Sequence, residues 1–376
     1  MMLALQEIRR SKVRFGLLSG AVGLLIFLIL FQQALLGGLI RDFIGAVDNQ
    51  NSPILVFNED ARQNVEGSFL FPDQVAEIAM VDGVGVSSPI GQGTFTVLAD
   101  SGLEDAVIFG YELGSLGEPQ TVVEGRLPEG PNEAVASEAD AENGFDIGDT
   151  VTVVGDAADL DITVVGLAED TRWSVSATLF VSYETFGDAQ RVVNPSSELI
   201  LPSLVAVEPQ AGVSEQQVIA SIETEVGGVE ALTKQEAVDQ SPGVQSVNQS
   251  FQIVLALAFL VVALVVGFFF LILTVQKAKA LTLLRAIGSP SSYLVKNLLF
   301  QILLVLGLGS LVGLLLTVAL VSLAPPGDLS VSVEPSSVAL TLGGIVVLAL
   351  LGGIASIRRV LRIDPISATT TAGANS

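Results

Sequence analysis

The residue types that the sequence lacks limit the chemistry it can perform. It contains no histidine and no cysteine. Nucleophilic pairs with histidine, thiolate metal sites and histidine ligands to zinc or haem are therefore excluded. No lysine follows the Gly-x-x-x-x-Gly pattern of a Walker A loop. We expect no catalytic residue, no resident metal and no intrinsic cofactor, and no ATP hydrolysis through a Walker A loop.

Carboxylates are the most abundant chemical groups, and they are concentrated in one segment. Of the 40 acidic residues, 36 lie between Asp42 and Asp239, and only six basic residues occur from Arg41 to Asp239. Among so many carboxylates, pairs that are close in sequence arise by chance, so we assign none of them to catalysis. A strongly acidic segment is typical of a well-solvated domain. It excludes nucleic acid as a partner, because phosphate binding needs a basic surface.

The remaining basic residues lie beside long apolar stretches. The stretch from Phe251 to Val275 holds 25 residues without a charge, which is enough to cross a bilayer as a helix. The other eleven Lys and Arg residues form three clusters that flank such stretches, and basic flanks stay on the cytoplasmic side. We predict an integral protein of the plasma membrane, with four transmembrane helices, both termini cytoplasmic and an inserted extracellular α+β domain.

The predicted segments follow from these charges and from the turn residues. A signal peptide is the alternative for the N-terminal stretch, but the apolar run is too long and lacks a convincing cleavage site. The predicted order is a cytoplasmic amphipathic helix (1–14), a first span with its outer extension (15–47), the extracellular domain (48–245), a second span (246–276), a cytoplasmic coupling helix or loop (277–297), a third span (298–323), a short outer loop (324–337), a fourth span (338–357) and a cytoplasmic tail (358–376).

The extracellular segment alternates between strand and helix patterns. The runs PILVF, GTFTVL, AVIFGY, TVTVV, DITVVGL and ATLFVSY are rich in β-branched and aromatic residues and predict strands. PDQVAEIAMV and SEQQVIASIETEV predict helices, the second with Ser214 as its N-cap. In the third and fourth spans glycines recur, at positions 307, 309, 313, 343, 344, 352 and 353. We interpret them as ordinary close packing of membrane helices.

The basic segment between the second and third spans has its own helical pattern. Leu281, Leu284 and Ile287 follow helical spacing, and Gly288 with the following Ser-Pro ends the helix. Such a helix could lie across the membrane surface and transmit force from a partner, or it could be a plain interfacial turn.

Several motifs resemble those of one family. LTVQKAKALTLLRAIGSPSSYLVKNLLFQ (273–301) is similar to the loop between spans two and three of FtsX/MacB-type (type VII) ABC transporter permeases. The tail RRVLRIDPISA (358–368) resembles the ending of the same family. In the outer segment VEGRLPEGPNEAVAS, GFDIGDTVTV and DITVVGLAED resemble the family's extracellular fold. Together the similarities extend over nearly the whole chain.

Within this family, the arrangement of four spans and one outer domain looks most like the HrtB-type haem exporters. That resemblance implies a homodimer, two copies of an HrtA-like ATPase subunit and ATP-driven export of haem for detoxification. The loop residues that would contact the ATPase are Lys279, Leu281, Leu284, Arg285, Ile287 and Gly288. Without histidine or cysteine, the haem iron would need Tyr183, Glu236, an amide oxygen, water or no protein ligand.

We place the expected haem site at the outer ends of spans one and two. Phe31, Ala34, Gly38, Arg41 and Gly45 share one helical face by their spacing. That face, together with Phe43, would offer aromatic and small residues to a flat ring and an arginine to a propionate. Four amides approach span two at the same depth: Gln245, Asn248, Gln249 and Gln252. The alternative is that Arg41 is an interfacial anchor paired with Asp42 and that the amides only cap a helix.

Two other functions remain open from the sequence. The cargo of the permease could be another hydrophobic molecule, such as a drug, a peptide or a lipid. Alternatively, the chain could be a non-transporting mechanotransmitter of the FtsX kind, in which ATPase cycles reshape the outer domain to activate an extracellular partner.

Overall fold

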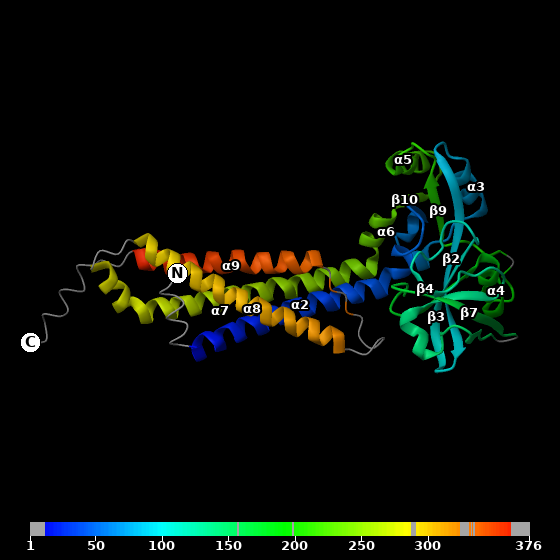
Figure 1. Cartoon of the computed structure of the whole chain (residues 1–376). Coiled ribbons are helices and arrows are strands. Elements are labelled where there is room, and N and C mark those ends of the chain that lie inside the picture. The colour runs from blue at the N-terminus through cyan, green and yellow to red at the C-terminus, as the bar shows by residue number, and fades with distance from the viewer. Residues whose placement is uncertain are drawn as a thin grey trace, which may run out of the picture. The chain divides into compact units, whose positions relative to one another are not determined.

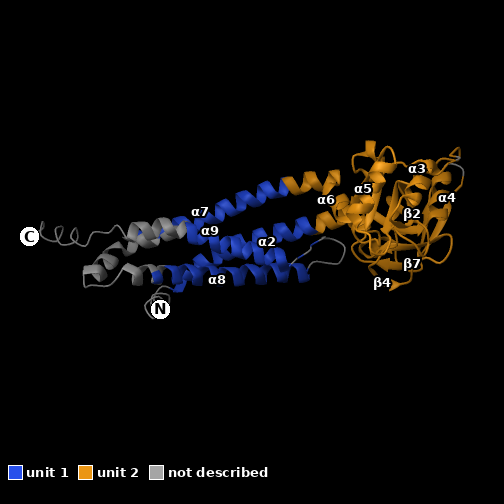
Figure 2. Cartoon of the chain, turned by 90° about the horizontal axis from the view of Figure 1, so that it is seen from above, with its two compact units in different colours: residues 1–37, 250–325, 331–376 blue, residues 38–249, 326–330 orange. Residues whose placement is uncertain are grey.

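The computed structural model describes residues 12–155, 158–197, 199–286, 291–323, 331, 333 and 335–361. The chain divides into two compact units, which Figure 2 colours separately. One comprises residues 1–37, 250–325 and 331–376, and we call it the helical unit. The other comprises residues 38–249 and 326–330, and we call it the β-rich unit.

Four long helices supply the helical unit, as Figure 1 shows: α2 (Lys12–Asp48), α7 (Pro242–Ala286), α8 (Ser291–Leu323) and α9 (Pro335–Leu361). Among the described residues, three helical stretches are long and apolar enough to cross a membrane, namely Phe15–Asp48, Pro242–Phe268 and Leu299–Leu323. The apolar part of α9, Pro335–Leu351, is shorter. The architecture is that of an α-helical membrane protein, and the fourth span stays a prediction.

The helices α2 and α8 approach each other closely because glycines face the contact. A Cβ added to Gly313 would lie 2.8 Å from Ile26 Cγ2 and 2.9 Å from the carbonyl oxygen of Gly23. Gly309 packs in the same way against Val22. Gly309 and Gly313 therefore serve close packing, as predicted for the glycines of this helix. Gly307 does not, since nothing lies within 4 Å of a Cβ added there.

The β-rich unit contains a first subdomain with a split β-α-β arrangement. Its strands are β1 (Ile54–Asn58), the first half of β2 (Val84–Ala99), β9 (Leu204–Pro209) and β10 (Val229–Thr233), in the spatial order β10-β1-β9-β2 and all antiparallel to their neighbours. The helices α3 (Pro72–Met80) and α5 (Glu215–Glu225) connect these strands in two β-α-β units. Ile78, Val218 and Ile222 from these helices share a buried cluster with the strands.

A closed ring of six strands is inserted between β2 and β9. The second half of β2 pairs with β3 (Gly102–Tyr111), and the ring continues through β8 (Ala177–Ser182), β5 (Glu133–Ser137), β7 (Leu160–Ala168) and β6 (Thr150–Val153) back to β2. The edge strand β4 (Val122–Gly125) pairs with β7. Inward side chains such as Phe95, Phe145 and Ile162 fill the ring and are fully or almost fully buried.

Short helices complete the β-rich unit. They are η1 (Glu59–Ala61), η2 (Val65–Gly67), η3 (Glu138–Asn143), α4 (Tyr183–Val193) and α6 (Lys234–Gln240). At α5 the Ser214 hydroxyl accepts from Gln217 N–H while the Gln217 side chain accepts from Ser214 N–H, so the predicted N-cap is confirmed as a capping box.

The six predicted strand runs correspond to β1, β2, β3, β6, β7 and β8, and the two predicted helices to α3 and α5. Pattern reasoning missed β4, β5, β9, β10, α4 and α6, most of which are short. The predicted N-terminal helix lies almost entirely outside the described residues, since the description begins at Lys12. The sequence analysis predicted that the second span ends at residue 276 and that a separate coupling helix or loop follows it. The structure differs at this point, because α7 runs without a break through residue 286.

Candidate functional site

The C-terminal end of α2 lies in the β-rich unit and is held by the loop between β7 and β8. We call residues 169–176 the clasp loop. Three backbone hydrogen bonds join it to the helix: Ala46 N–H donates to Arg172 C=O (3.1 Å), Ser174 N–H to Phe43 C=O (3.1 Å) and Val175 N–H to Asp42 C=O (2.9 Å). Gly45 makes the approach possible, since a Cβ there would collide with the Asp170 carbonyl. Backbone hydrogen bonds therefore hold the clasp loop against the end of α2.

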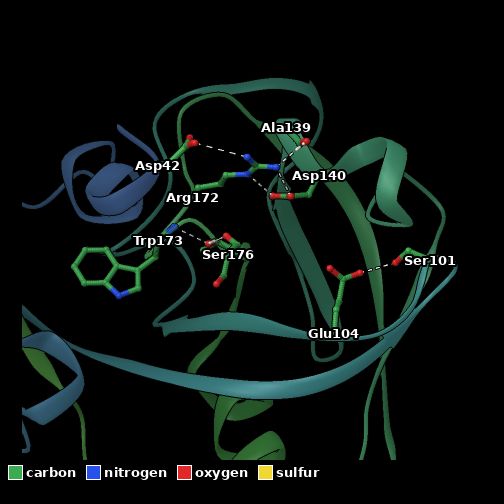
Figure 3. Close-up of polar contacts among 9 residues, drawn as sticks. Asp42, Ser101, Glu104, Ala139, Asp140, Arg172, Trp173 and Ser176 are labelled. Carbon is green, nitrogen blue, oxygen red and sulfur yellow. Dashed lines mark hydrogen bonds and ion pairs between the residues drawn. The ribbon is translucent and has the colours of Figure 1, made fainter. Parts of the chain in front are cut away.

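Arg172 carries the positive charge of the clasp loop, and Figure 3 shows its polar contacts. Its Nε and Nη2 donate to the two carboxylate oxygens of Asp140, at 3.0 and 2.5 Å. Nη2 also donates to the carbonyl of Ala139 at 3.1 Å, and Nη1 lies 3.7 Å from Asp42 Oδ2. The side chains of Arg172 and Asp140 are only 12% and 6% exposed. Hydrogen bonding to Asp140 raises the pKa of Arg172, so the guanidinium stays charged.

The backbone of the clasp loop is strained at three positions. Asp170, Ser174 and Val175 have φ values of 55°, 52° and 63°. This left-handed region is unfavourable for a β-branched residue such as Val175. Between them Trp173 is buried, with its ring edge against Phe109 at a centroid distance of 5.7 Å. A conformation of this kind persists only where the surrounding contacts fix it.

Arg41 of α2 also contacts the clasp loop. Its Nη1 lies 3.0 Å from Asp170 Oδ2, and the two side chains are 42% and 38% exposed. Asn49 Nδ2 donates to the Asp170 carbonyl at 2.6 Å. Asp42, the sequence neighbour of Arg41, lies 3.7 Å from Arg172 Nη1. An exposed pair of this kind contributes at most about 1 kcal/mol, so Asp170 can be displaced from Arg41 at small cost.

Phe43 links the end of α2 to the beginning of α7. It is half-buried and packs on the hydrophobic cluster that holds Trp173 and Val244. A Cβ added to Gly243 in the first turn of α7 would contact the Phe43 ring at 3.4 Å. The structure thus brings Arg41, Phe43 and the start of α7 together within the β-rich unit.

The four predicted amides continue along α7. Gln245, Gln249 and Gln252 are exposed, and Asn248 is half-buried. Their spacing of three and four residues places them on one face of the helix. Gln245, Asn248 and Gln249 belong to the β-rich unit and Gln252 to the helical unit.

Tyr183 and Glu236 use their polar atoms locally. Tyr183 begins α4, and its hydroxyl donates to the Ile200 carbonyl at 3.4 Å. Burial, with a smaller contribution from the Glu112 charge, raises the pKa of Tyr183 to about 12. Glu236 Oε2 accepts hydrogen bonds from the backbone and hydroxyl of Thr233, at 3.1 and 2.8 Å, and caps α6.

Phe31 lies on α2 in the helical unit and stacks on Phe27, with ring centroids 5.9 Å apart. Beside it are two glutamines that the sequence analysis did not select. Gln32 Nε2 donates to the Phe251 carbonyl of α7 at 3.4 Å, and Gln33 Oε1 accepts from Thr341 of α9 at 2.7 Å. Two amides inside an apolar stretch are themselves a signal of such ties.

Four of the six predicted ATPase-contacting residues fall at the end of α7. Positions 279, 281, 284 and 285 are helical, as the last turns of α7. Ile287 and Gly288 lie outside the described residues. The contact with an ATPase therefore stays a prediction.

Residues 252–365 match the family described as FtsX-like permease C-terminal. Over 378 residues the chain is 23% identical to a Staphylococcus haemolyticus protein provisionally named hemin transport system permease protein HrtB, covering 98% of this chain and 99% of that one. It is 24% identical over 369 residues to a Staphylococcus epidermidis protein of the same name, covering 98% and 99%. An uncharacterized ABC transporter permease of Mycobacterium tuberculosis is 25% identical over 367 residues, covering 97% and 98%.

Two solved structures also resemble part of the chain. One is the periplasmic region of MacB from Actinobacillus actinomycetemcomitans, with 15% identity, a TM-score of 0.36 and coverage of 50% of this chain and 92% of that one. The other is the extracellular domain of the ABC-type transporter YknZ from Gram-positive bacteria, with 15% identity, a TM-score of 0.35 and coverage of 48% and 100%. These scores are too low to carry an argument.

Proposed function

We propose, from the premise that this chain is an FtsX/MacB-type permease of an ABC transporter, that it exports haem from the membrane to the exterior. Relatives that carry the HrtB name are 23% and 24% identical over nearly the full length of both chains. In this proposal the chain resides in the plasma membrane with both termini cytoplasmic, and residues 48–245 are extracellular.

The haem proposal rests on the exposure of Arg41 and on its weak ion pair. It follows an apolar helical stretch, its side chain is 42% exposed, and it forms an ion pair with the exposed carboxylate of Asp170. A haem propionate is also a carboxylate, and it could replace Asp170 at little cost because exposed pairs are weak. Phe43 beside it, and Phe31 further along α2, would offer aromatic surface to the porphyrin.

The remaining candidates have smaller roles in this proposal. Gln245, Asn248, Gln249 and Gln252 would supply amide hydrogen bonds along one face of α7. Tyr183 and Glu236 would each have to give up local hydrogen bonds to bind iron. The proposal therefore places haem recognition on its propionates and ring, and leaves the iron to water or to no protein ligand.

Transport in this proposal needs partners. Two copies of the chain would pair with two copies of an HrtA-like ATPase, which would bind ATP and contact the segment from Lys279 to Gly288. Purification of the tagged chain after co-expression with a candidate ATPase subunit would check this. A complex with two copies of each protein is expected, and a chain that never retains the ATPase would contradict it.

Hemin titration tests the cargo. We expect the full-length chain in detergent to give a saturable shift of the Soret band, and Arg41→Ala to weaken hemin binding about tenfold or more, since a hydrogen bond to a charged group contributes about 1.5–3 kcal/mol. Arg191→Ala is the matched control, because Arg191 also forms an exposed ion pair in the β-rich unit, with Asp188. An unchanged affinity in Arg41→Ala removes Arg41 from the site. Absence of saturable binding removes haem and leaves drugs, peptides and lipids as cargo.

The clasp loop favours mechanotransmission as a second function. A loop that grips the end of α2 through three backbone hydrogen bonds would pass a displacement of the helix to the strands β7 and β8. Trp173 in this loop is the only tryptophan of the chain and is buried. We expect its fluorescence to change when ATP is added to the complex with the ATPase. A signal that ATP leaves unchanged would count against mechanotransmission.

A further inference from the structure

A polar cavity lies in the β-rich unit, and no residue of the clasp loop lines it. It is open to solvent and has a volume of about 530 Å³, which is within the range of small-molecule sites. Its walls come from the residues that follow α2, from Gln120 and from the first turns of α5 and α6. Both helices pack on β10 (Figure 1). We call this space the polar cavity.

Hydrogen bonds fix the walls of the polar cavity. Gln120 N–H donates to Asn49 C=O at 2.8 Å, which holds Gln120 beside the segment that follows α2. Lys234 at the start of α6 donates twice to the same segment, from its backbone N–H to Pro53 C=O at 2.9 Å and from Nζ to Gln50 C=O at 3.0 Å. The cavity is therefore built into the fold between the residues after α2 and the short helix before α7.

One wall of the polar cavity carries a buried hydroxyl. Ser52 is only 1% exposed, and its Oγ has no hydrogen-bond partner among the described residues. Buried polar atoms are nearly always hydrogen-bonded, so each exception needs an explanation. A polar ligand in the cavity would explain this one, since a hydroxyl can both donate and accept. An ordered water is the alternative explanation, and the two differ in what removal of the hydroxyl does.

Two opposite charges line the polar cavity without pairing with each other. Glu215 and Lys234 are both half-buried, and within the described part of the chain no ion pair joins them. The Glu215 carboxylate accepts no hydrogen bond there, and Lys234 Nζ uses one of its three donors on Gln50. A partly buried charge is stabilised by a partner of opposite sign. A ligand that satisfies both residues carries one cationic and one anionic group.

The neutral part of the wall is made of amides. The side chains of Gln120 and Gln216 are exposed and form no hydrogen bond to any residue that the structure describes. Each offers a carbonyl oxygen and an NH₂ group, which complement the N–H and C=O of a peptide bond. None of the lining residues is aromatic, so the cavity offers no stacking surface to a flat ring.

We propose that the polar cavity binds a zwitterion of the peptide class, either an amino acid or a short peptide. Glu215 would hold its ammonium group and Lys234 its carboxylate, while Ser52 and the two glutamine amides would bind the groups between them. This site shares no residue with the proposed haem site and does not rest on it. With residues 48–245 outside the membrane, as proposed, the ligand would reach the cavity from the exterior. Once bound, it would tie the segment after α2 to the helix before α7.

Calorimetric titration of the full-length chain in detergent tests the proposal, with L-alanine, dialanine and trialanine as probes. We expect saturable binding of at least one of them, and the length that binds most tightly separates an amino-acid site from a peptide site. N-acetyl-dialanine amide carries neither charge and should bind about tenfold more weakly or less, because hydrogen bonds to charged groups are the strong ones. Failure of all three zwitterions to bind, or equal binding of the capped peptide, overturns the proposal.

Three variants locate the binding in the polar cavity. Glu215→Gln keeps the size of the side chain and should weaken binding about tenfold or more. Glu225→Gln is the matched control, because Glu225 is an exposed residue at the other end of α5 and does not line the cavity. Equal affinities of these two variants overturn the site.

The third variant, Ser52→Ala, separates a ligand from an ordered water. It should weaken binding without lowering the unfolding temperature, because it removes a buried hydroxyl that has no partner in the fold. Unchanged affinity with a lower unfolding temperature would show that water satisfies this hydroxyl, and it would overturn the proposed site.

Discussion

Replacing Arg172 with methionine is expected to lower the free energy of unfolding of the β-rich unit by about 3–5 kcal/mol. The variant leaves the Asp140 carboxylate, which is 6% exposed, without its bidentate partner. A buried charge whose partner is removed loses this much because it can regain neither water nor a counter-charge. Methionine keeps most of the apolar stem of arginine, so the loss reports the charge.

The measurement is urea unfolding of the full-length protein in detergent, followed by Trp173 fluorescence. Trp173 is the only tryptophan and lies in the β-rich unit, so its signal reports this unit. Arg191→Met is the matched control: it breaks an arginine–aspartate pair whose side chains are 53% and 46% exposed, and it should cost at most about 1 kcal/mol.

The double variant Arg172→Met, Asp140→Leu should recover part of the stability, because it removes the uncompensated charge. A loss in Arg172→Met no larger than that in Arg191→Met would show that the buried pair does not stabilise the clasp loop. If the double variant is no more stable than Arg172→Met, Asp140 stabilises the unit in some way other than by pairing with Arg172.

Replacing Gly313 with leucine is expected to separate α2 from α8 and to destabilise the helical unit by about 1–3 kcal/mol or more. The new Cβ would lie 2.9 Å from the Gly23 carbonyl oxygen, and a backbone atom cannot move aside as a flexible side chain can. The readout is the temperature at which half of the detergent-solubilised protein stays monodisperse after heating. It should fall by about 2–4 °C for each kcal/mol.

Gly307→Leu is the control on the same helix. Nothing lies within 4 Å of a Cβ added there, and leucine is a better helix former than glycine by up to about 1 kcal/mol. This control should therefore be neutral or slightly stabilising. Equal losses in the two variants would mean that glycine itself, and not the close approach of α2, is what α8 requires.

The apolar runs and the strongest strand patterns could be predicted from sequence because each is local. A charge-free run of 25 residues or a run such as AVIFGY, whose residues Ala106 to Tyr111 are all buried, needs no knowledge of its partner. Strand order is different. That β3 pairs in parallel with β8, and that β1 lies between β9 and β10, depends on contacts between distant segments.

The candidate site shows the same limit. Arg41 was recognisable as a lone cation after an apolar stretch, but its partner Asp170 lies 129 positions away. Arg172 and Asp140 each resemble ordinary surface charges in an acidic segment, and only the folded clasp loop brings them together. Two consecutive left-handed residues, Ser174 and Val175, could not be expected either, because valine disfavours that conformation.

The position of β1 in the sheet has a consequence for biosynthesis. It is the first strand of the β-rich unit to be made, yet both of its neighbours, β9 and β10, are the last. Until they emerge, an apolar strand whose residues Ile54 to Phe57 are all buried in the finished unit has no partner in the sheet. Unpaired strands of this kind favour aggregation and chaperone binding. The ring from β2 to β8 can close earlier, so folding should finish with β1, as the ribosome begins to deliver α7.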